Sequence, residues 1–207
     1  MIEDNSEHIT ILYSSSGKVT EVKNKTTGLS KVKYYYDETD IRIKKEGYDN
    51  SGNIIKTTYY VFGASLNAIY EDKHDGNGTK QKEVPIYGGG RIGVAYKDVN
   101  QDIDHYSYEL TDHLGNVRAV IRDDGTVTYY ADYYPFGWTM PERNGGDAYR
   151  YTYQGQEKDP ETGWEAFELR MYDGRVGRWM TTDPYSEFHS PYLAMGNNPV
   201  STIDPDG

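Results

Sequence analysis

The residues of this sequence that could do chemistry are mainly carboxylates. The densest acidic cluster contains Asp98, Asn100, Asp102, Asp104 and Glu109. Four of these five match the spacing of oxygen ligands in a calcium-binding loop. The position where such a loop bends sharply and needs glycine is occupied by Ile103, and no flanking helices are expected. We therefore interpret this segment as an acidic loop between two strands and predict no metal site there.

Other catalytic residue types are scarce. The sequence contains no Cys, which excludes disulfides, thiolate zinc sites and cysteine nucleophiles. Its five His show no paired ligand spacing on a common element, although His105 and His113 have acidic neighbours. No Ser has a nucleophile-elbow context, and the glycine-rich segment 87–93 is more typical of a hairpin or bulge than of a phosphate-binding loop. We expect neither a metal nor a cofactor.

The charge balance limits the class of partner. The net charge is −11, from 33 acidic and 22 basic side chains, which argues against binding to nucleic acid or to an anionic membrane. A solvated, self-repelling surface explains this charge better than an acidic active groove. The acidic start of the sequence, residues 1–5, lacks the apolar region of a secretory signal, so none is expected here. No stretch approaches the roughly 20 apolar residues of a membrane span.

The composition predicts an all-β protein. The 22 Tyr far outnumber the 4 Phe and 3 Trp, and Tyr favours half-exposed sheet faces. Alternating apolar residues predict strands at 10–13 and 57–62, and the Tyr59-Tyr60 doublet should place one ring on each face of a sheet. Turns recur in which an acidic residue precedes a glycine, as in Asp49 to Gly52. The sequence therefore predicts antiparallel hairpin repeats, stacked as part of a spiral sheet.

The amino-acid composition changes along the chain, first near its middle and again in its last third. Twelve of thirteen Lys precede residue 100, whereas seven of nine Arg follow it, and prolines become frequent near the end. We expect a hairpin-repeat segment at 1–140 and an irregular segment at 141–207. Within the second we predict a connecting loop at 141–146, short strands at 149–154 and 165–172, and a helical turn near 191–196.

These sequence motifs resemble those of a known family. "YDNSGN", "TTYYV", "PIYGGGRIG", "YELTDHLGNVRAV" and "YYPFGWTM" resemble the YD repeats of Rhs-type proteins. From Tyr149 onward, "YQGQEKDPETG", "RMYDGRVGRWMTTDP", "GNNPV" and "DPDG" resemble the Rhs repeat-associated core domain. The resemblance covers most of the chain after about Tyr34, and its most specific part is the ordered set in the final third.

The resemblance implies a fold and a function. In this family, many YD repeats wind into a hollow β-sheet shell that encloses a C-terminal toxin, and the core domain closes one end as a plug. The core is similar to an aspartyl self-protease that cuts just after the closing DPxG motif. The sequence is therefore expected to be the terminal part of such a shell. Its partners would be a toxin domain of the same polypeptide, further repeats and secretion-system components, and the whole protein would be secreted or displayed on the cell surface.

Three residues carry the predicted self-cleavage. Matching the family motif position by position gives Arg170 in "LRMYDG", Asp183 in "TTDP" and Asp204 in "DPDG". The resemblance implies that Asp183 and Asp204 are the catalytic carboxylates and that Arg170 assists them. Glycine stands at 174, where the family usually has proline after the aspartate, and the sequence printed here stops before the residue expected at the cut.

The chemistry of such a site follows from elementary electrostatics. Two carboxylates held close together share a proton, so one can act as base on water and the other as acid on a peptide carbonyl. An Arg can orient a carboxylate or stabilise the developing oxyanion. Spacing alone also allows a plain salt bridge at an Asp-Pro turn, and we interpret Asp159, Asp173 and Asp206 as turn residues. The alternatives are a purely structural β-scaffold without proteolytic activity and a surface module whose Tyr rings bind carbohydrate.

Overall fold

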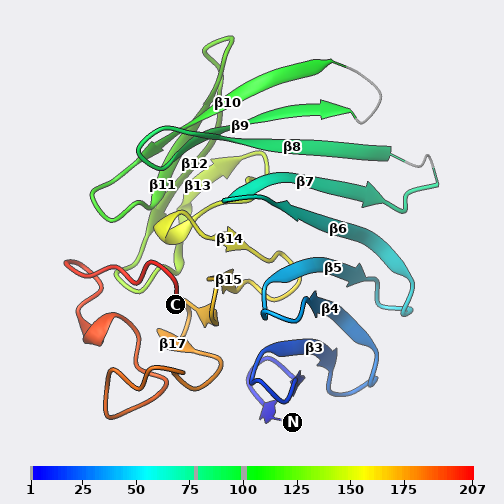
Figure 1. The fold of residues 1–207 in the computed structure, drawn as a ribbon, viewed down its shortest axis with the longest axis vertical. Helices are drawn as coiled ribbons and strands as arrows, with labels where there is room; N and C mark the ends of the chain where they lie inside the picture. The colour runs from blue at the N-terminus through cyan, green and yellow to red at the C-terminus, as the bar shows by residue number, and fades with distance from the viewer. Residues whose placement is uncertain (1, 77–78, 99–101) are drawn as a thin grey trace. The chain divides into compact units, whose positions relative to one another are not determined.

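The computed structural model describes residues 2–76, 79–98 and 102–207, and its regular elements are almost entirely strands (Figure 1). The larger of two sheets has 13 strands that follow one another in chain order. Its strands are β1 (Ile2–Asp4), β2 (Ile9–Tyr13), β3 (Val19–Asn24), β4 (Ser30–Tyr36), β5 (Arg42–Tyr48), β6 (Ile54–Phe62), β7 (Leu66–Lys73), β8 (Thr79–Tyr87), β9 (Arg91–Asp98), β10 (Ile103–Thr111), β11 (Val117–Arg122), β12 (Val127–Tyr133) and β13 (Thr139–Gly146).

The smaller sheet has four short antiparallel strands, also in chain order. They are β14 (Glu157–Lys158), β15 (Glu165–Ala166), β16 (Met171–Asp173) and β17 (Arg178–Trp179). The helical content of the described residues is two single 3-10 turns, η1 (Tyr153–Gly155) and η2 (Met195–Asn197). The all-β prediction is confirmed.

The chain forms two compact units, which we describe separately. The first comprises 1–85 with 94–104, and the second comprises 86–93 with 105–207. In the first unit, Val22, Val32 and Ile69 are fully buried. The second unit contains β11 to β17 and all three predicted catalytic residues. Since the predicted division at 140 and 141 follows family segments rather than compactness, it stays a prediction.

One type of turn recurs between the strands, and it explains the repeated sequence pattern in which an acidic residue precedes a glycine. The N–H of its first residue donates to the carbonyl of the fifth, and the N–H of its fourth residue donates back to the carbonyl of the first. The turns begin at Ser14, Asp37, Asp49, Asp112, Arg122, Tyr134 and Thr152. The fourth residue always has a positive φ, and it is Gly in every turn except the one containing Asp40. Gly adopts this conformation without steric cost.

An aspartate at the first position closes the turn from within. Asp49 Oδ1 accepts hydrogen bonds from the backbone N–H groups of Ser51 and Asn53, each at 2.8 Å. Asp37 and Asp112 hold their own turns in the same way. The turn predicted from Asp49 to Gly52 is thus confirmed, and aspartates at the first position of two further turns act in the same way.

Tyr rings cover both faces of the larger sheet, as the doublets predict. Tyr59 is 47% exposed whereas Tyr60 is 7% exposed, and Tyr133 and Tyr134 divide in the same way. In the first unit, the Tyr35 and Tyr48 hydroxyls donate to Glu46 Oε2 at 2.6 and 2.8 Å. The hydrogen bond to this carboxylate, together with burial, raises the pKa of Tyr35 to about 12. A Tyr-rich sheet face is therefore stabilised by carboxylates that accept the hydroxyl protons.

The strands predicted at 10–13 and 57–62 are confirmed as β2 and β6. Three local predictions in the last third are wrong. Residues 141–146 form the last part of β13 rather than a loop, because an edge strand tolerates Pro141. Residues 149–154 contain a single bridge at Tyr151 and the start of η1, and 165–172 divides into β15 and β16. The predicted helical turn lies slightly later, at η2.

Aromatic residues form the core of the second unit. The buried cluster consists of Ala131, Tyr133, Tyr153, Phe167, Tyr172, Trp179, Ala194 and Met195. Trp179 packs edge-on against Phe167, with ring centroids 4.9 Å apart, and Tyr153 stacks on Tyr172 at 5.9 Å. Such ring pairs stabilise beyond the area that they bury. The cluster joins β12 to the small sheet and to η1 and η2.

Gly137 tests how tightly this core is packed. A Cβ atom at Gly137 would lie 2.5 Å from the Tyr153 ring, whereas one at Gly125 would meet nothing within 4 Å, although both residues have φ near +88° (+87° and +88°). We expect Gly125→Ala to lower the free energy of unfolding by about 1 kcal/mol through backbone strain alone, and Gly137→Ala by about 3 kcal/mol or more. Denaturant unfolding of the two variants measures the difference. Equal losses would show that the Tyr153 ring moves aside freely.

Candidate functional site

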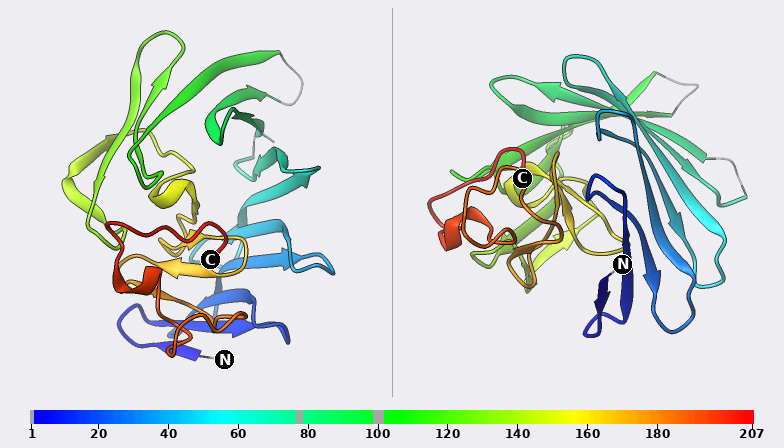
Figure 2. Two further views of the ribbon diagram at one scale, coloured as in Figure 1. Left: turned by 60° about the vertical axis from the view of Figure 1, so that its left-hand side comes forward. Right: turned by 60° about the horizontal axis from the view of Figure 1, so that its bottom comes forward.

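Three separate segments of the second unit bring Arg170, Asp183 and Asp204 together. Arg170 directly precedes β16, Asp183 lies in the loop after β17, and Asp204 belongs to the final segment, which returns to the small sheet (Figure 2). Arg170 Nη1 lies 3.6 Å from Asp183 Oδ2, and Arg170 Nη2 lies 3.7 Å from Asp204 Oδ2. The arginine therefore stands between the two carboxylates.

The guanidinium of Arg170 is almost fully removed from water. Its side chain is 5% exposed, and it lies over the Trp179 ring, 4.4 Å from the ring centroid. Arg170 Nε donates to the Gly207 carbonyl oxygen at 2.6 Å, and Nη1 donates to the Pro191 carbonyl at 3.4 Å. Burial lowers the pKa of Arg170, and the charges of Asp183 and Asp204 oppose that effect. Arginine nonetheless stays protonated in proteins, so the site holds a fixed positive charge.

Asp183 is held as an ionised carboxylate. Its side chain is 5% exposed, and its Oδ1 and Oδ2 accept hydrogen bonds from the backbone N–H groups of Tyr185 at 2.8 Å and Glu187 at 3.3 Å. Burial alone would raise the pKa of Asp183. The backbone donors and Arg170 outweigh burial, so the pKa falls below its ordinary value.

The pKa of Asp204 shifts in the opposite direction. Its side chain is 17% exposed, and burial raises its pKa above the ordinary value, assisted by the charges of Asp206 and Asp183. The Gly207 N–H, which donates to Asp204 Oδ1 at 2.9 Å, and Arg170 oppose this rise. The two carboxylates beside Arg170 therefore differ in the direction of their pKa shifts, with that of Asp183 lowered and that of Asp204 raised.

The segment after Asp204 is packed into the site. The Leu169 N–H donates to the Asp206 carbonyl at 2.8 Å. Gly207 is buried with φ +89°, and a Cβ there would lie 2.6 Å from Phe167 Cβ. Only glycine fits this position without displacing the aromatic core. The arrangement thus places the main-chain oxygen of Gly207, the last residue of the printed sequence, against a guanidinium flanked by two carboxylates.

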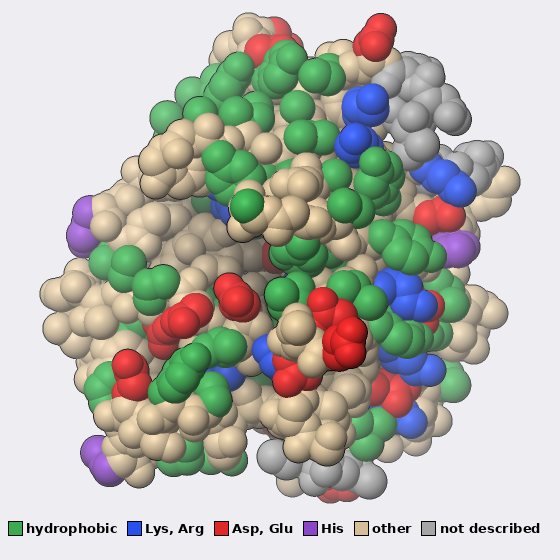
Figure 3. All heavy atoms as spheres, in the orientation of Figure 1, with side chains coloured by type: hydrophobic (Ala, Val, Ile, Leu, Met, Phe, Trp, Pro, Cys, Tyr) green, Lys and Arg blue, Asp and Glu red, His purple; other side chains and the backbone are tan. Residues whose placement is uncertain are grey.

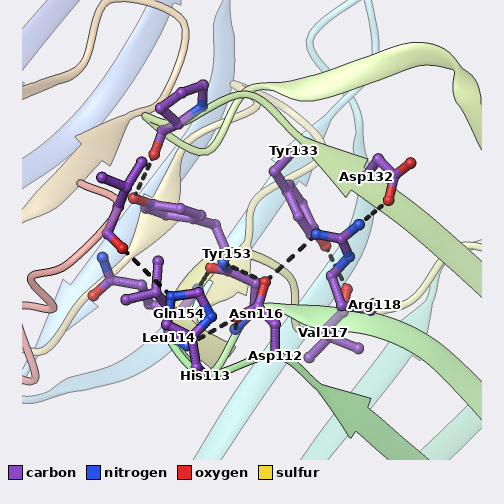
Figure 4. A network of polar contacts seen from close by, with 12 residues as sticks. Asp112, His113, Leu114, Asn116, Val117, Arg118, Asp132, Tyr133, Tyr153 and Gln154 are labelled. Atoms are coloured by element: carbon purple, nitrogen blue, oxygen red, sulfur yellow. Dashed lines mark hydrogen bonds and ion pairs between the residues drawn. The ribbon is translucent and has the colours of Figure 1, made fainter.

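A polar network beside the site was missed in the sequence. The Gln154 N–H donates to Asn116 Oδ1 at 2.9 Å (Figure 4). Gln154 Oε1 accepts from the Asp204 N–H, also at 2.9 Å. Asn116 closes the Asp112 turn at the start of β11. The turn pattern identifies Asp112 and Asn116 as a unit, but no local signal links them to Asp204, which is distant in sequence.

Asp159 and Asp173, two of the three residues interpreted as turn formers, accept hydrogen bonds within turns. Asp173 Oδ1 accepts from the Arg175 N–H at 2.8 Å, and the Asp159 carbonyl accepts from the Gly163 N–H at 2.7 Å. Asp206 instead contributes its carbonyl to the anchoring of the final segment.

The acidic segment 98–109 is only partly visible, since Asn100 lies outside the described residues. Within the described part, Glu109 Oε1 accepts from Arg91 Nε at 2.8 Å and from the Tyr149 hydroxyl at 2.6 Å. Among the described residues, no group of three or more His, Cys, Asp or Glu is placed to hold a metal ion. His113 Nε2 lies 3.4 Å from the Val200 carbonyl oxygen.

Charge and apolarity are mixed on the surface. Figure 3 shows carboxylate, basic and apolar side chains interspersed on the face it presents. No helix of the described chain has the length and apolarity to cross a membrane.

Comparison with known proteins finds a consistent set of relatives. The Teneurin YD-shell family profile matches residues 2–198. The chain is 36% identical over 186 residues to "Salivary gland surface protein 1" of Aedes aegypti, covering 85% of this chain and 5% of that protein. It is 30% identical over 209 residues to "tRNA nuclease WapA" of Bacillus subtilis (strain 168), covering 96% of this chain and 8% of the relative. "Toxin subunit YenC1" of Yersinia entomophaga is 27% identical over 204 residues, which are 92% of this chain and 21% of that protein.

Solved structures show the same fold. The "TcdB2-TccC3-Cdc42" crystal structure superposes with a TM-score of 0.80 at 20% identity, over 97% of this chain and 10% of that chain. The chain thus spans a small part of the length of the relatives that it matches. With the family profile covering most of the sequence and an all-β sheet built from recurring hairpin turns, the chain belongs to the Teneurin YD-shell family and is an Rhs/YD-repeat protein.

Proposed function

We propose that this chain is the C-terminal part of an Rhs-like toxin-delivery protein and that its last third is a single-turnover aspartyl autoprotease. Cleavage falls just after the DPDG motif at 204–207. The observation that carries this proposal is the placement of one buried guanidinium against Asp183, Asp204 and the Gly207 carbonyl. A protease that cuts after this motif requires a donor at the Gly207 carbonyl oxygen, and Arg170 Nε would supply it.

The proposed reaction is hydrolysis of the peptide bond that follows Gly207. Ionised Asp183 takes a proton from water, the hydroxide oxygen bonds to the Gly207 carbonyl carbon, and Asp204 gives its proton to the carbonyl oxygen. Arg170 Nε, already 2.6 Å from that oxygen, stabilises the charge that develops there. The tetrahedral diol then collapses. The C–N bond breaks, Asp183 passes its proton to the leaving nitrogen, and a diol hydroxyl returns a proton to Asp204.

Intramolecular geometry makes a modest site sufficient for one turnover. The segment to be cut is already held against the site by the Asp206 carbonyl and by the buried Gly207. A reacting group held in place has an effective concentration far above that of a free substrate. The site therefore needs no binding cleft for a second molecule.

The relatives support the delivery role. One is named as a tRNA nuclease, another as a toxin subunit, and TcdB2–TccC3 structures share the fold. On this proposal the sheet is one end of a shell that encloses a C-terminal toxin domain of the same polypeptide, and the small sheet belongs to its plug. The other partners are the remaining repeats and components of a secretion system, and the whole protein is secreted or displayed at the cell surface.

Mass spectrometry of the purified full-length polypeptide tests the proposal. We expect a break after residues 204–207 in the wild type and cleavage slowed at least about tenfold in Arg170→Lys, because lysine cannot reach two carboxylates and a carbonyl at once. Arg175→Lys is the matched control, since Arg175 Nη2 lies 3.2 Å from Oδ2 of the neighbouring turn residue Asp173. A folded wild type that stays intact would overturn the protease proposal.

A structural scaffold is the alternative that the geometry also allows. Asp183 accepts two backbone hydrogen bonds within its own loop, which is what a plain turn residue does. On that view Arg170 only neutralises the buried carboxylates. An intact wild type with lowered stability in Arg170→Lys would favour this alternative.

A further inference from the structure

The position of Asp204 depends on a turn of the repeat sheet. The final segment meets the rest of the second unit through Gln154, whose Oε1 accepts the Asp204 N–H at 2.9 Å. Gln154 in turn rests on Asn116, the last residue of the turn between β10 and β11 (Figure 4). The link from Asp112 to Asp204 therefore runs through consecutive hydrogen bonds.

The turn fixes the orientation of the Asn116 amide. Asp112 Oδ1 accepts from the Leu114 N–H at 3.0 Å and from the Asn116 N–H at 3.1 Å, which holds the carboxylate over the turn. Asp112 Oδ2 accepts from Asn116 Nδ2 at 2.9 Å. Because its nitrogen is engaged there, the Asn116 amide directs its oxygen toward the Gln154 N–H. Asn116 is also buried, so water cannot easily replace this contact.

Gln154 is held in a conformation that it would not adopt freely. Its φ is +48°, in the left-handed region that is unfavourable for a non-glycine residue. Its Nε2 is buried and has no hydrogen-bond partner among the described residues. A strained backbone and an unsatisfied buried donor are both unfavourable. Gln154 nevertheless keeps this conformation, in which its Oε1 accepts the hydrogen bond from the Asp204 N–H.

We propose that Asn116 and Gln154 are positioning residues that make the assembly of the Asp204 site depend on a folded β10–β11 hairpin. The proposal rests on the proposed function, because what it regulates is self-cleavage. Before the hairpin closes, Asn116 has no fixed orientation and Asp204 is not held beside Arg170. Cleavage then waits until this part of the repeat sheet has formed.

A second contact makes the same connection. His113, within the same turn, places Nε2 3.4 Å from the Val200 carbonyl of the final segment. The turn therefore reaches the segment directly at Val200 and through Gln154 at Asp204, on either side of residues 201–203. The loop between β15 and β16 also reaches the final segment, where Leu169 and Arg170 donate to the Asp206 and Gly207 oxygens, so the β10–β11 turn adds to this anchoring on the other side of Asp204.

The test compares Gln154→Met and Asn116→Ala in the full-length polypeptide. Gln154→Met keeps the side-chain volume but removes the acceptor, and we expect cleavage about 100-fold slower, as for a misplaced catalytic group. Asn116→Ala should have a similar effect, and the double variant should be little worse than either, because both act through one chain of contacts. Gln156→Met and Asn144→Ala are the matched controls, with cleavage expected to change less than about twofold.

A pH profile separates positioning from general destabilisation. Gln154→Glu keeps an acceptor for the Asp204 N–H but adds a negative charge beside Asp204, whose pKa already responds to the charges of Arg170, Asp206 and Asp183. That charge raises the pKa of Asp204 and moves the falling limb of the cleavage profile to higher pH. A residue that only stabilised the fold would leave the shape of the profile unchanged.

Hydrogen exchange of the amides at 200–207 decides the matter independently of cleavage. Faster exchange in Gln154→Met and Asn116→Ala than in the two controls is expected whether or not the chain cuts itself. If the wild type does not cut, the proposed function fails while the exchange data still test the positioning. Wild-type cleavage rates and wild-type exchange in both variants would overturn the inference.

Discussion

Asp204→Asn is expected to lower the rate of self-cleavage by about 1,000-fold or more, with Asp183→Asn at least as severe. An amide can neither give up a proton as a carboxylic acid does nor accept one as a carboxylate does. A positioned acid or base increases the reaction rate roughly 100- to 10,000-fold. Both substitutions preserve side-chain shape. The measurement is the time course of the cleaved product after refolding of the full-length polypeptide.

The pH dependence of the wild type follows from the directions of the two pKa shifts. Asp183 must be ionised, so the rate rises as pH increases through its lowered pKa. Asp204 must be protonated, so the rate falls as pH increases through its raised pKa. Cleavage should therefore be fastest between the lowered pKa of Asp183 and the raised pKa of Asp204, and slower on either side of that window. Asp204→Asn should lose the falling limb, and Asp183→Asn the rising limb.

Asp206→Asn is the control for charge near the cut. Asp206 is exposed, and its backbone rather than its carboxylate anchors the final segment, so the rate should change only a few-fold. If Asp204→Asn cuts itself at the wild-type rate, Asp204 is not the acid of the reaction. The same result in Asp183→Asn would remove the base.

Glu165→Gln is expected to stabilise the protein by about 3 kcal/mol at pH 8 and to change little at pH 4.5. Glu165 lies on β15, is 1% exposed, and its Oε1 is 3.3 Å from Lys158 Nζ. Its Oε2 accepts no hydrogen bond from the described residues. Burial raises the pKa of Glu165 to about 7, although the Lys158 charge opposes the rise. A neutral amide of the same shape avoids the cost of burying this charge.

The sign of the pH effect follows from proton binding. In the unfolded chain Glu165 has an ordinary pKa near 4.5, against about 7 in the folded protein. Between these values the folded state holds more protons, so its stability is greatest below about pH 4.5 and is lost as pH rises toward 7. The difference of about 2.5 in pKa corresponds to roughly 3 kcal/mol.

Denaturant unfolding of wild type and Glu165→Gln between pH 4.5 and 8 measures how much Glu165 contributes to the free energy of unfolding at each pH. Subtracting the two curves removes contributions from other carboxylates such as Asp183, whose lowered pKa acts in the opposite direction. Glu168→Gln serves as the control, because Glu168 is exposed and two residues after β15. A constant difference across the pH range would mean that Glu165 is solvated in the folded protein.

Local patterns allowed much of the fold to be predicted. The Tyr doublets and the Asp-to-Gly turns specify strand faces and turn geometry within a few residues, as Tyr59-Tyr60 and the Asp49 turn show. Elements whose residues contradict their own propensities were missed. Pro141 lies in an edge strand, and the glycines at 145 and 146 lie where neighbouring strands leave no room for a side chain.

The site was predictable only where the motif itself carried it. The resemblance identified Arg170, Asp183 and Asp204, and the structure places the two carboxylates on either side of the guanidinium. The supporting residues could not be read from the sequence, because a hydrogen bond from Asp204 to Gln154 depends on tertiary packing. Glu165 was missed for a related reason, since an isolated Glu in a polar sequence is usually exposed.

The recurring turn also bears on how the chain folds. Each turn is closed by its own first and fourth residues, and each strand of the larger sheet pairs with the strand next to it in sequence. Contacts of such short sequence separation form quickly, and a hairpin can close before the chain beyond it exists. Synthesis at about 5–20 residues per second leaves ample time for each hairpin to add to the growing sheet. The sheet can therefore be laid down vectorially from the N-terminal end, with the segment at 204–207 docking last.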